Sequence, residues 1–293
     1  MRAFVLTAAL LSLAAPAMAA GADSMFAERS ALLAADRRCE LFTPQMRQAL
    51  QASTFQARGV LLRAGWTAAR ADALSRGAAR EVSSRRCDDP VLLKAASDAR
   101  FGFSGWTRLM GMTFPGGERT WSARRAADPQ GFYIRQDIPG APLGPRPAVF
   151  GVRREGNGGS LMLVMSLRPG EAAPSTARLS FRDTARATRS IADTPGRLGH
   201  GLASLVASPA TARITHAQAR AVETGEHGAR AVVFTFPDAA LHTMKGLDPR
   251  EAMTITLEGR QTITLLVEVG DIAAAHAFLA AEAVTGAGTP SSR

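Results

Sequence analysis

The spacing of apolar residues divides the chain into two regions, and the first, residues 24–110, has the period of helices. Leu32, Ala35 and Cys39 fall three and four positions apart, which places them on one face of a first helix. We expect the last of four helices to carry its apolar face as far as Met110. Short connections between amphipathic helices predict a compact antiparallel bundle. Suitable N-cap residues precede the second, third and fourth helices, namely Thr43, Thr67 and Asp89.

From about residue 119 the apolar period changes to two, which predicts β-strands with one buried face. The segment at residues 160–167, "SLMLVMSL", is apolar throughout and predicts a central strand covered on both faces. Residues 237–246 predict a short inserted helix, and Asp271 is expected to cap a final one. The glycines of "GNGG" and "EGRQ" predict hairpin turns. Three segments, "ARLSF", "RAVVFTF" and "MTITL", place these residues inward: Ala177, Leu179, Phe181, Val232, Phe234, Phe236, Met253, Ile255 and Leu257.

The change of period predicts an α+β protein in which an antiparallel helical bundle precedes an antiparallel β-sandwich-like domain. We expect the bundle to span residues 20–112 and the β-rich domain to span 119–283. The glycine- and proline-containing segment 111–118 is expected to link them. The tail, residues 284–293, has nothing to bury after Val284 and is expected to be disordered.

Residues 119–281 contain, in this order, "GFYIRQ", "LMLVMSL", "RLSFRD" and "VVFTFPDAALHTMKGLDPREAMTITLEG", ending in "GDIAAAHAFL". In the order and spacing of these segments the region resembles the invasion-associated locus B family of secreted proteobacterial proteins. The resemblance implies a small β-sandwich-like domain in the periplasm or on the cell surface, and it carries over no catalytic residue.

The N-terminus has the pattern of a secretory signal peptide over residues 1–19. Arg2 precedes an apolar run, and small residues stand at Ala17 and Ala19 before the expected cleavage point. No later stretch approaches the ~20 apolar residues of a transmembrane helix. We therefore expect a soluble protein that is periplasmic or secreted.

Export to an oxidising compartment favours a disulfide between the two cysteines, Cys39 and Cys87. Two arginines precede each cysteine, so the alternative is a Cys87 thiol made reactive by neighbouring positive charge.

The chain is strongly basic, with 35 Lys and Arg against 25 Asp and Glu, and nearly all of the basic residues are arginines. The disulfide would bring together Arg37, Arg38, Arg85 and Arg86. These four guanidinium groups either pair with Asp36, Glu40, Asp88 and Asp89 or form a docking patch for an anionic partner. An envelope component or a protein is the expected partner. We do not expect nucleic acid, because no basic run is interleaved with aromatic residues.

Catalytic and metal-binding motifs are weak. Asp238 and His242 lie four apart on the short helix and are the best metal candidates, with Glu223, Glu226 and His227 upstream as weaker ones. The segment "GRLGHG" lacks the lysine of a phosphate-binding loop and predicts a flexible loop. No cofactor is expected.

Two function classes follow. The first is an exported, soluble, non-enzymatic envelope protein that binds or stabilises another cell-envelope component. The alternative is a secreted hydrolase whose site is assembled from β-domain loops around His200 or His242.

Overall fold

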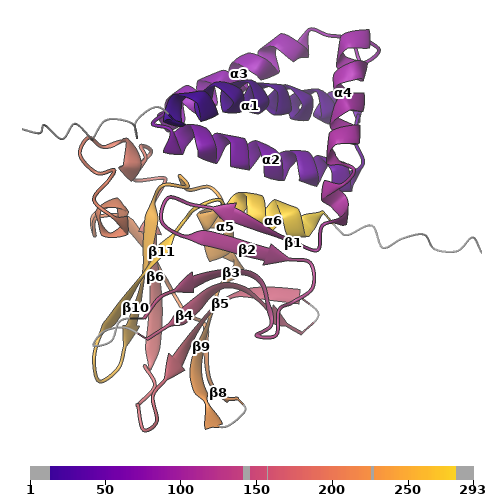
Figure 1. Cartoon of the computed structure of the whole chain (residues 1–293). Helices are drawn as coiled ribbons and strands as arrows, with labels where there is room; N and C mark the ends of the chain where they lie inside the picture. The colour runs from indigo at the N-terminus through magenta and orange to yellow at the C-terminus, as the bar shows by residue number, and fades with distance from the viewer. Residues whose placement is uncertain (1–13, 141–145, 157, 226–227, 282–293) are drawn as a thin grey trace, which may run out of the picture.

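The computed structural model describes residues 14–140, 146–156, 158–225 and 228–281. Within them, the chain forms six α-helices and two antiparallel sheets, which confirms the predicted mixed α+β composition (Figure 1). The predicted tail, 284–293, and most of the predicted signal peptide, 1–13, lie outside the described residues. The first helix begins at Ala14 and so crosses the expected cleavage point after Ala19.

The N-terminal part contains α1 (Ala14–Cys39), α2 (Pro44–Arg63), α3 (Ala68–Ser83) and α4 (Pro90–Phe103). All three predicted N-caps are confirmed: Thr43, Thr67 and Asp89 accept hydrogen bonds from backbone N–H groups of the first turns. α1 packs against α2 and α3, and α4 crosses the ends of these helices (Figure 1). The last helix is shorter than predicted, because α4 ends at Phe103 and Met110 is 55% exposed.

The disulfide between Cys39 and Cys87 is confirmed, with a Cα–Cα distance of 5.4 Å. Neither cysteine is free, so the reactive-thiol alternative is wrong. The bridge joins the end of α1 to the turn between α3 and α4. Closing a loop of this length stabilises a protein by roughly 4 kcal/mol in the chain-entropy model.

The larger sheet has seven strands in the order β1-β2-β3-β4-β5-β9-β8. The smaller sheet has four, in the order β11-β10-β6-β7. Every residue predicted to face inward from "ARLSF", "RAVVFTF" and "MTITL" is buried. The larger sheet consists of β1 (Gly111–Pro115), β2 (Thr120–Arg124), β3 (Phe132–Ile138), β4 (Ala148–Glu155), β5 (Gly158–Leu167), β8 (Ala219–Thr224) and β9 (Arg230–Phe236). The smaller sheet consists of β6 (Thr176–Arg182), β7 (Ala212–His216), β10 (Ala252–Glu258) and β11 (Ile263–Glu268).

The segment predicted as a linker is instead part of the larger sheet. β1 pairs with β2, and the glycines of "FPGGE" form the turn of this hairpin. Backbone N–H groups of Gly117, Glu118 and Arg119 all donate to the buried carboxylate of Glu268. A Cβ at Gly116 would lie 2.5 Å from that carboxylate, so glycine is required for the approach.

The two short helices of the C-terminal half are α5 (Asp238–Met244) and α6 (Ile272–Ala280). α6 lies between α2 and strands β1 and β2 (Figure 1). It is apolar nearly all round, as expected for a helix covered on two sides. Phe278 packs in the same core as Phe114, and it connects the helical part to the larger sheet.

Asp271 does not cap α6 through its side chain, contrary to the prediction. Both carboxylate oxygens instead accept hydrogen bonds from Arg63 at the end of α2, at 3.0 and 2.9 Å. Burial raises the pKa of Asp271, and the hydrogen bonds and charge of Arg63 oppose that shift. Gly59 makes the approach possible, since a Cβ there would lie 2.2 Å from an Asp271 oxygen. The pair of Arg63 and Asp271 therefore holds the end of α2 against the start of α6.

A second buried arginine, Arg250, ties three parts of the chain together. Its guanidinium donates to both oxygens of Asp248 at 3.0 and 2.8 Å, and to Asp193 at 2.7 Å. It also donates to the carbonyl oxygen of Leu62, in the last turn of α2, and to that of Trp66, in the connection from α2 to α3. Burial disfavours the Asp248 carboxylate, but hydrogen bonds and charge from Arg250 outweigh it, so the pKa of Asp248 is lowered.

Replacing Arg250 by Gln removes this connection and leaves Asp248 buried without its cation. We expect the free energy of unfolding to fall by about 3–5 kcal/mol, measured by urea denaturation. The control is Arg100→Gln at an exposed position of α4, which should change the free energy of unfolding by less than about 0.5 kcal/mol. Equal effects of the two substitutions would contradict the role of Arg250.

Replacing Gly59 by Ala should destabilise the protein by about 1–3 kcal/mol, because the added methyl overlaps the fixed Asp271 side chain. Gly77, inside α3, offers a matched control, since a Cβ there meets no atom within 4 Å. Gly77→Ala should stabilise by about 0.5–1 kcal/mol. Thermal unfolding of both variants measures the difference, and stabilisation by Gly59→Ala would show that the contact is absent.

Candidate functional site

The outward-facing positions of the larger sheet are unusually apolar at its centre. Phe150, Leu163 and Phe234 face the core, and the alternate positions of the same strands face outward. Val149 lies opposite Val164, and Val164 lies opposite Val233, so three strands contribute one row of outward valines. Outward positions of a half-solvated antiparallel sheet are normally polar. This row therefore marks a surface that is partly protected from water.

The larger sheet curls, and this curl protects the row of outward valines from water. A single ion pair shows the curl. Arg153 on β4 donates to both carboxylate oxygens of Glu223 on β8, at 2.6 and 2.9 Å. In the register of the strands, Arg153 stands opposite Ser160, whereas the row of Glu223 passes through Ser166. These rows are about 20 Å apart along β5. A flat sheet would keep the two side chains apart, so its outer face must be concave.

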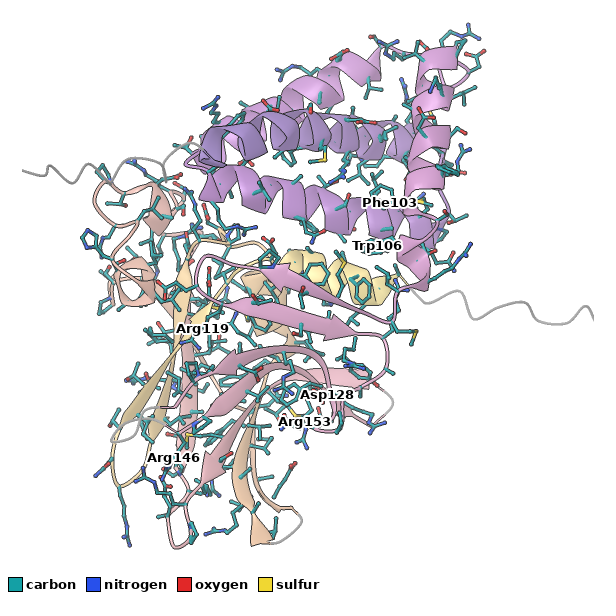
Figure 2. The ribbon with its side chains drawn as sticks, in the orientation of Figure 1. Phe103, Trp106, Arg119, Asp128, Arg146 and Arg153 are labelled. Carbon is teal, nitrogen blue, oxygen red and sulfur yellow. A yellow bond between two sulfur atoms is a disulfide. The ribbon has the colours of Figure 1, made fainter. Side chains whose placement is uncertain are left out.

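The concave face holds a hollow of about 670 Å³, which we call the outer groove. Its floor includes Val149, Val164 and Ala231. Arg153, labelled in Figure 2, lines the hollow together with its partner Glu223, and Arg135 lines it as well. The volume and the apolar floor are typical of ligand sites, which combine apolar walls with a few placed polar groups.

Most charged groups at the rim of the outer groove are already paired. Arg135 donates to Asp128 at 2.8 Å and also contacts Asp137 and Gln130. Burial works against the Asp128 carboxylate, but hydrogen bonds from Arg135 and Phe132 prevail and lower the pKa of Asp128. Arg153 donates to Glu223 and to the Gln130 carbonyl oxygen. The groove can therefore bind an apolar group between ion-paired walls, and Arg230, which also lines it, donates to the Glu171 carbonyl oxygen.

Smaller hollows lie elsewhere on the molecule. An apolar groove of about 280 Å³ between α1, α3 and α4 is lined by Leu32, Val82 and Val91. A cleft of about 490 Å³ lies where α2 meets the "FPGGE" turn and the "GRLGHG" segment. Three of its charged residues, Arg63, Arg250 and Glu268, already form the structural hydrogen bonds described above, and the fourth, Glu118, is exposed. The outer groove is larger than either and is our candidate site.

The four arginines predicted to form a docking patch do lie around the disulfide, but three have internal partners. Arg38 donates to carbonyl oxygens at the end of α3 and to that of Arg85. Arg85 pairs with Asp89 at 3.2 Å, and Arg86 pairs with Asp88 at 2.9 Å. Arg37 is exposed and makes no hydrogen bond or ion pair within the described part of the chain. Docking at this patch stays a prediction.

Asp36 was expected to pair with these arginines, and this prediction was wrong. Its buried carboxylate accepts hydrogen bonds from Arg47 on α2 and from the Phe42 backbone. It holds the α1–α2 connection instead.

The weak metal candidates are not brought together. Asp238 and His242 are both exposed on α5, which follows the end of β9. Glu223 lies beside the beginning of β9 and is bound to Arg153. Glu226 and His227 lie outside the described residues. Among the residues that are described, no group of three His, Cys, Asp or Glu side chains could hold a metal ion.

The hydrolase alternative requires a histidine placed with a carboxylate and a hydroxyl. His200 and His242 are exposed, and within the described ranges neither side chain makes a hydrogen bond or ion pair. The sequence did not predict which side chains line the outer groove, although it contains the outward valines. Without the strand register, nothing in the sequence indicated that Val149, Val164 and Val233 adjoin.

No family model, curated protein or solved structure matches the chain. None of the described helices has the length and apolar character needed to cross a membrane.

His276 on α6 makes stability depend on pH. Burial, with the positive charge of Lys245, lowers the pKa of His276 from 6.5 to about 4. Between these values the unfolded chain binds a proton that the folded chain does not, so the free energy of unfolding falls as the pH drops from 6.5 to 4. His276→Gln should lose less stability over this interval in denaturation at several pH values. Exposed His216→Gln is the control, and equal pH slopes for both variants would refute the assignment.

Proposed function

We propose that the protein is an exported, non-enzymatic envelope protein that binds another cell-envelope component in the outer groove. The observation that carries the proposal is an apolar floor, made by Val149, Val164 and Ala231, between ion-paired walls. Such a floor gains free energy when an apolar surface of a partner displaces water from it, by roughly 25 cal/mol per Å².

Location and architecture belong to the same proposal. Residues 1–19 act as a signal peptide that directs the chain to the periplasm or beyond. The helices form a disulfide-stapled bundle, and the two sheets form a sandwich-like domain similar to that of the invasion-associated locus B family. The disulfide between Cys39 and Cys87 supports an oxidising compartment.

The partner is an anionic envelope component or a protein rather than nucleic acid. A formal net charge of +10 supports attraction to anionic surfaces. The groove contacts apolar groups of the partner, and the net positive charge attracts the partner over a longer range. This division fits binding better than chemistry, because the rim carboxylates Asp128 and Glu223 are held by arginines.

Filling the groove tests the proposal. Val164→Trp places a large side chain on the floor, where Val164 is only half-buried and the fold can accept it. We expect retention of the mature protein on isolated envelopes to weaken on the order of tenfold, which is about 1.4 kcal/mol. Sedimentation with envelopes measures this, with thermal unfolding as the check on folding.

The matched control is Ile214→Trp on β7 of the smaller sheet, where Ile214 is already 52% exposed. Its retention should equal that of the wild type. If Val164→Trp folds normally and is retained as well as the control, the outer groove is not the binding site.

A further inference from the structure

A set of arginines at one end of the two sheets has more positive charge than the protein neutralises. The loop from β5 to β6 crosses there from the larger sheet to the smaller one. Arg146, Arg220 and Arg230 come from three separate places in the chain, and each donates to this loop. We call them, together with Arg260, the basic cluster.

The contacts within the basic cluster are mostly weak. Arg146 reaches a Glu171 carboxylate oxygen at 3.4 Å, and Arg230 reaches the Glu171 carbonyl oxygen at 3.4 Å. Arg220 makes a shorter bond, 2.7 Å, to the carbonyl oxygen of Pro174. Both Glu171 contacts exceed the usual length of a charge-assisted hydrogen bond, which is about 2.7–2.9 Å. A better acceptor could replace them.

Glu171 is the one carboxylate that these arginines contact within the described residues. One terminal nitrogen of Arg146, Nη2, is buried and has no hydrogen-bond partner there. A buried donor without an acceptor costs roughly 1–3 kcal/mol. The cluster therefore lacks acceptor oxygens as well as negative charge.

A hollow of about 400 Å³ lies between this loop and the β10–β11 turn. Glu171 and Arg260 line it, and Arg260 is exposed without a hydrogen bond or ion pair in the described ranges. An anion in the hollow would lie beside Arg260 and Glu171. It would compete with Glu171 for Arg146 and Arg230, which contact Glu171 but do not themselves line the hollow.

We propose that the basic cluster binds a phosphate group. Four guanidinium groups against one carboxylate favour an anion with more than one charge, and a phosphate monoester carries about −1.5 to −2 at neutral pH. Its three oxygens can accept from several planar guanidinium groups at once, including the unpartnered Arg146 Nη2. The proposal deepens the proposed function, on which it rests, by naming the anionic chemistry of the envelope component.

Calorimetric titration of the full mature chain with inorganic phosphate and with acetate tests this binding. We expect the wild type to prefer phosphate at least tenfold, and Arg146→Gln/Arg230→Gln to bind phosphate at least tenfold more weakly. The control is Arg100→Gln/Arg108→Gln, which removes two exposed positive charges on the helical side and should match the wild type. Equal loss in both double variants would reduce the effect to net charge and overturn the proposal.

Glu171→Gln tests the same site in the opposite direction. It removes the competing carboxylate, so phosphate should bind several-fold more tightly, a gain that a merely structural Glu171 would not produce. Unchanged or weaker binding would overturn the proposal even if the arginine variants fail to fold.

The source of the phosphate is distinguished with phosphatidylcholine vesicles that contain or lack phosphatidic acid. Cosedimentation that requires both phosphatidic acid and the basic cluster identifies a lipid headgroup. Phosphate binding without such cosedimentation identifies a soluble or polymer-borne phosphate. Failure of the outer groove would appear as unchanged envelope retention of Val164→Trp, and failure of the basic cluster as unchanged phosphate affinity of Arg146→Gln/Arg230→Gln, so the two failures give different results.

Discussion

The rest of the structure depends on how the end of α2 is held, and buried arginines hold it. Arg63 clamps Asp271 at the start of α6, and Arg250 binds the Leu62 carbonyl group in the last turn of α2 and the Trp66 carbonyl group just after the helix. These contacts join residues 184 to 208 positions apart in the chain. Since α6 fills the space between α2 and the first strands of the larger sheet, they set the position of the helical part on the β part. Each guanidinium offers five donors in a plane, which suits a junction where carbonyls and carboxylates converge.

Much of the secondary structure was predictable, because helix caps and strand alternation are local signals. Thr43, Thr67 and Asp89 marked helix starts correctly, and the inward faces of three strands were correct at every residue. β1, β7 and β8 were missed. β8 is exposed along its whole length, so it has no apolar alternation to detect, and the glycines after β1 resembled a linker. The central strand β5 was placed correctly, but Val164 and Ser166 are not covered on the outer face.

The candidate site was much less predictable than the fold. Pairs of adjacent arginines suggested an outward patch, yet Arg38, Arg85 and Arg86 bind carbonyls or carboxylates of their own neighbourhood. The buried charges of "LDPRE" gave no signal at all, since sequence cannot distinguish Asp248 and Arg250 from surface loop residues. The basic cluster comes from strand ends and turns that only the sheet topology brings together. The pairing of strands that are distant in sequence determines which residues meet in the outer groove and in the basic cluster. The apolar period of a single strand carries no information on this pairing.

The ion pair between Arg153 and Glu223 indicates that one bend of the larger sheet both forms the outer groove and protects the edge strand β8. β8 is an edge strand, and a flat exposed edge invites pairing with other chains. Both side chains are partly exposed, at 22% and 45%, so the pair contributes little free energy on its own, about 0–1 kcal/mol. Its geometry is more informative, because it shows that β8 curls toward β4. The same curl bends the edge away from the plane of the sheet and shelters Val164 and Val233 from water. The outer groove thus follows from a constraint that the edge strand already requires.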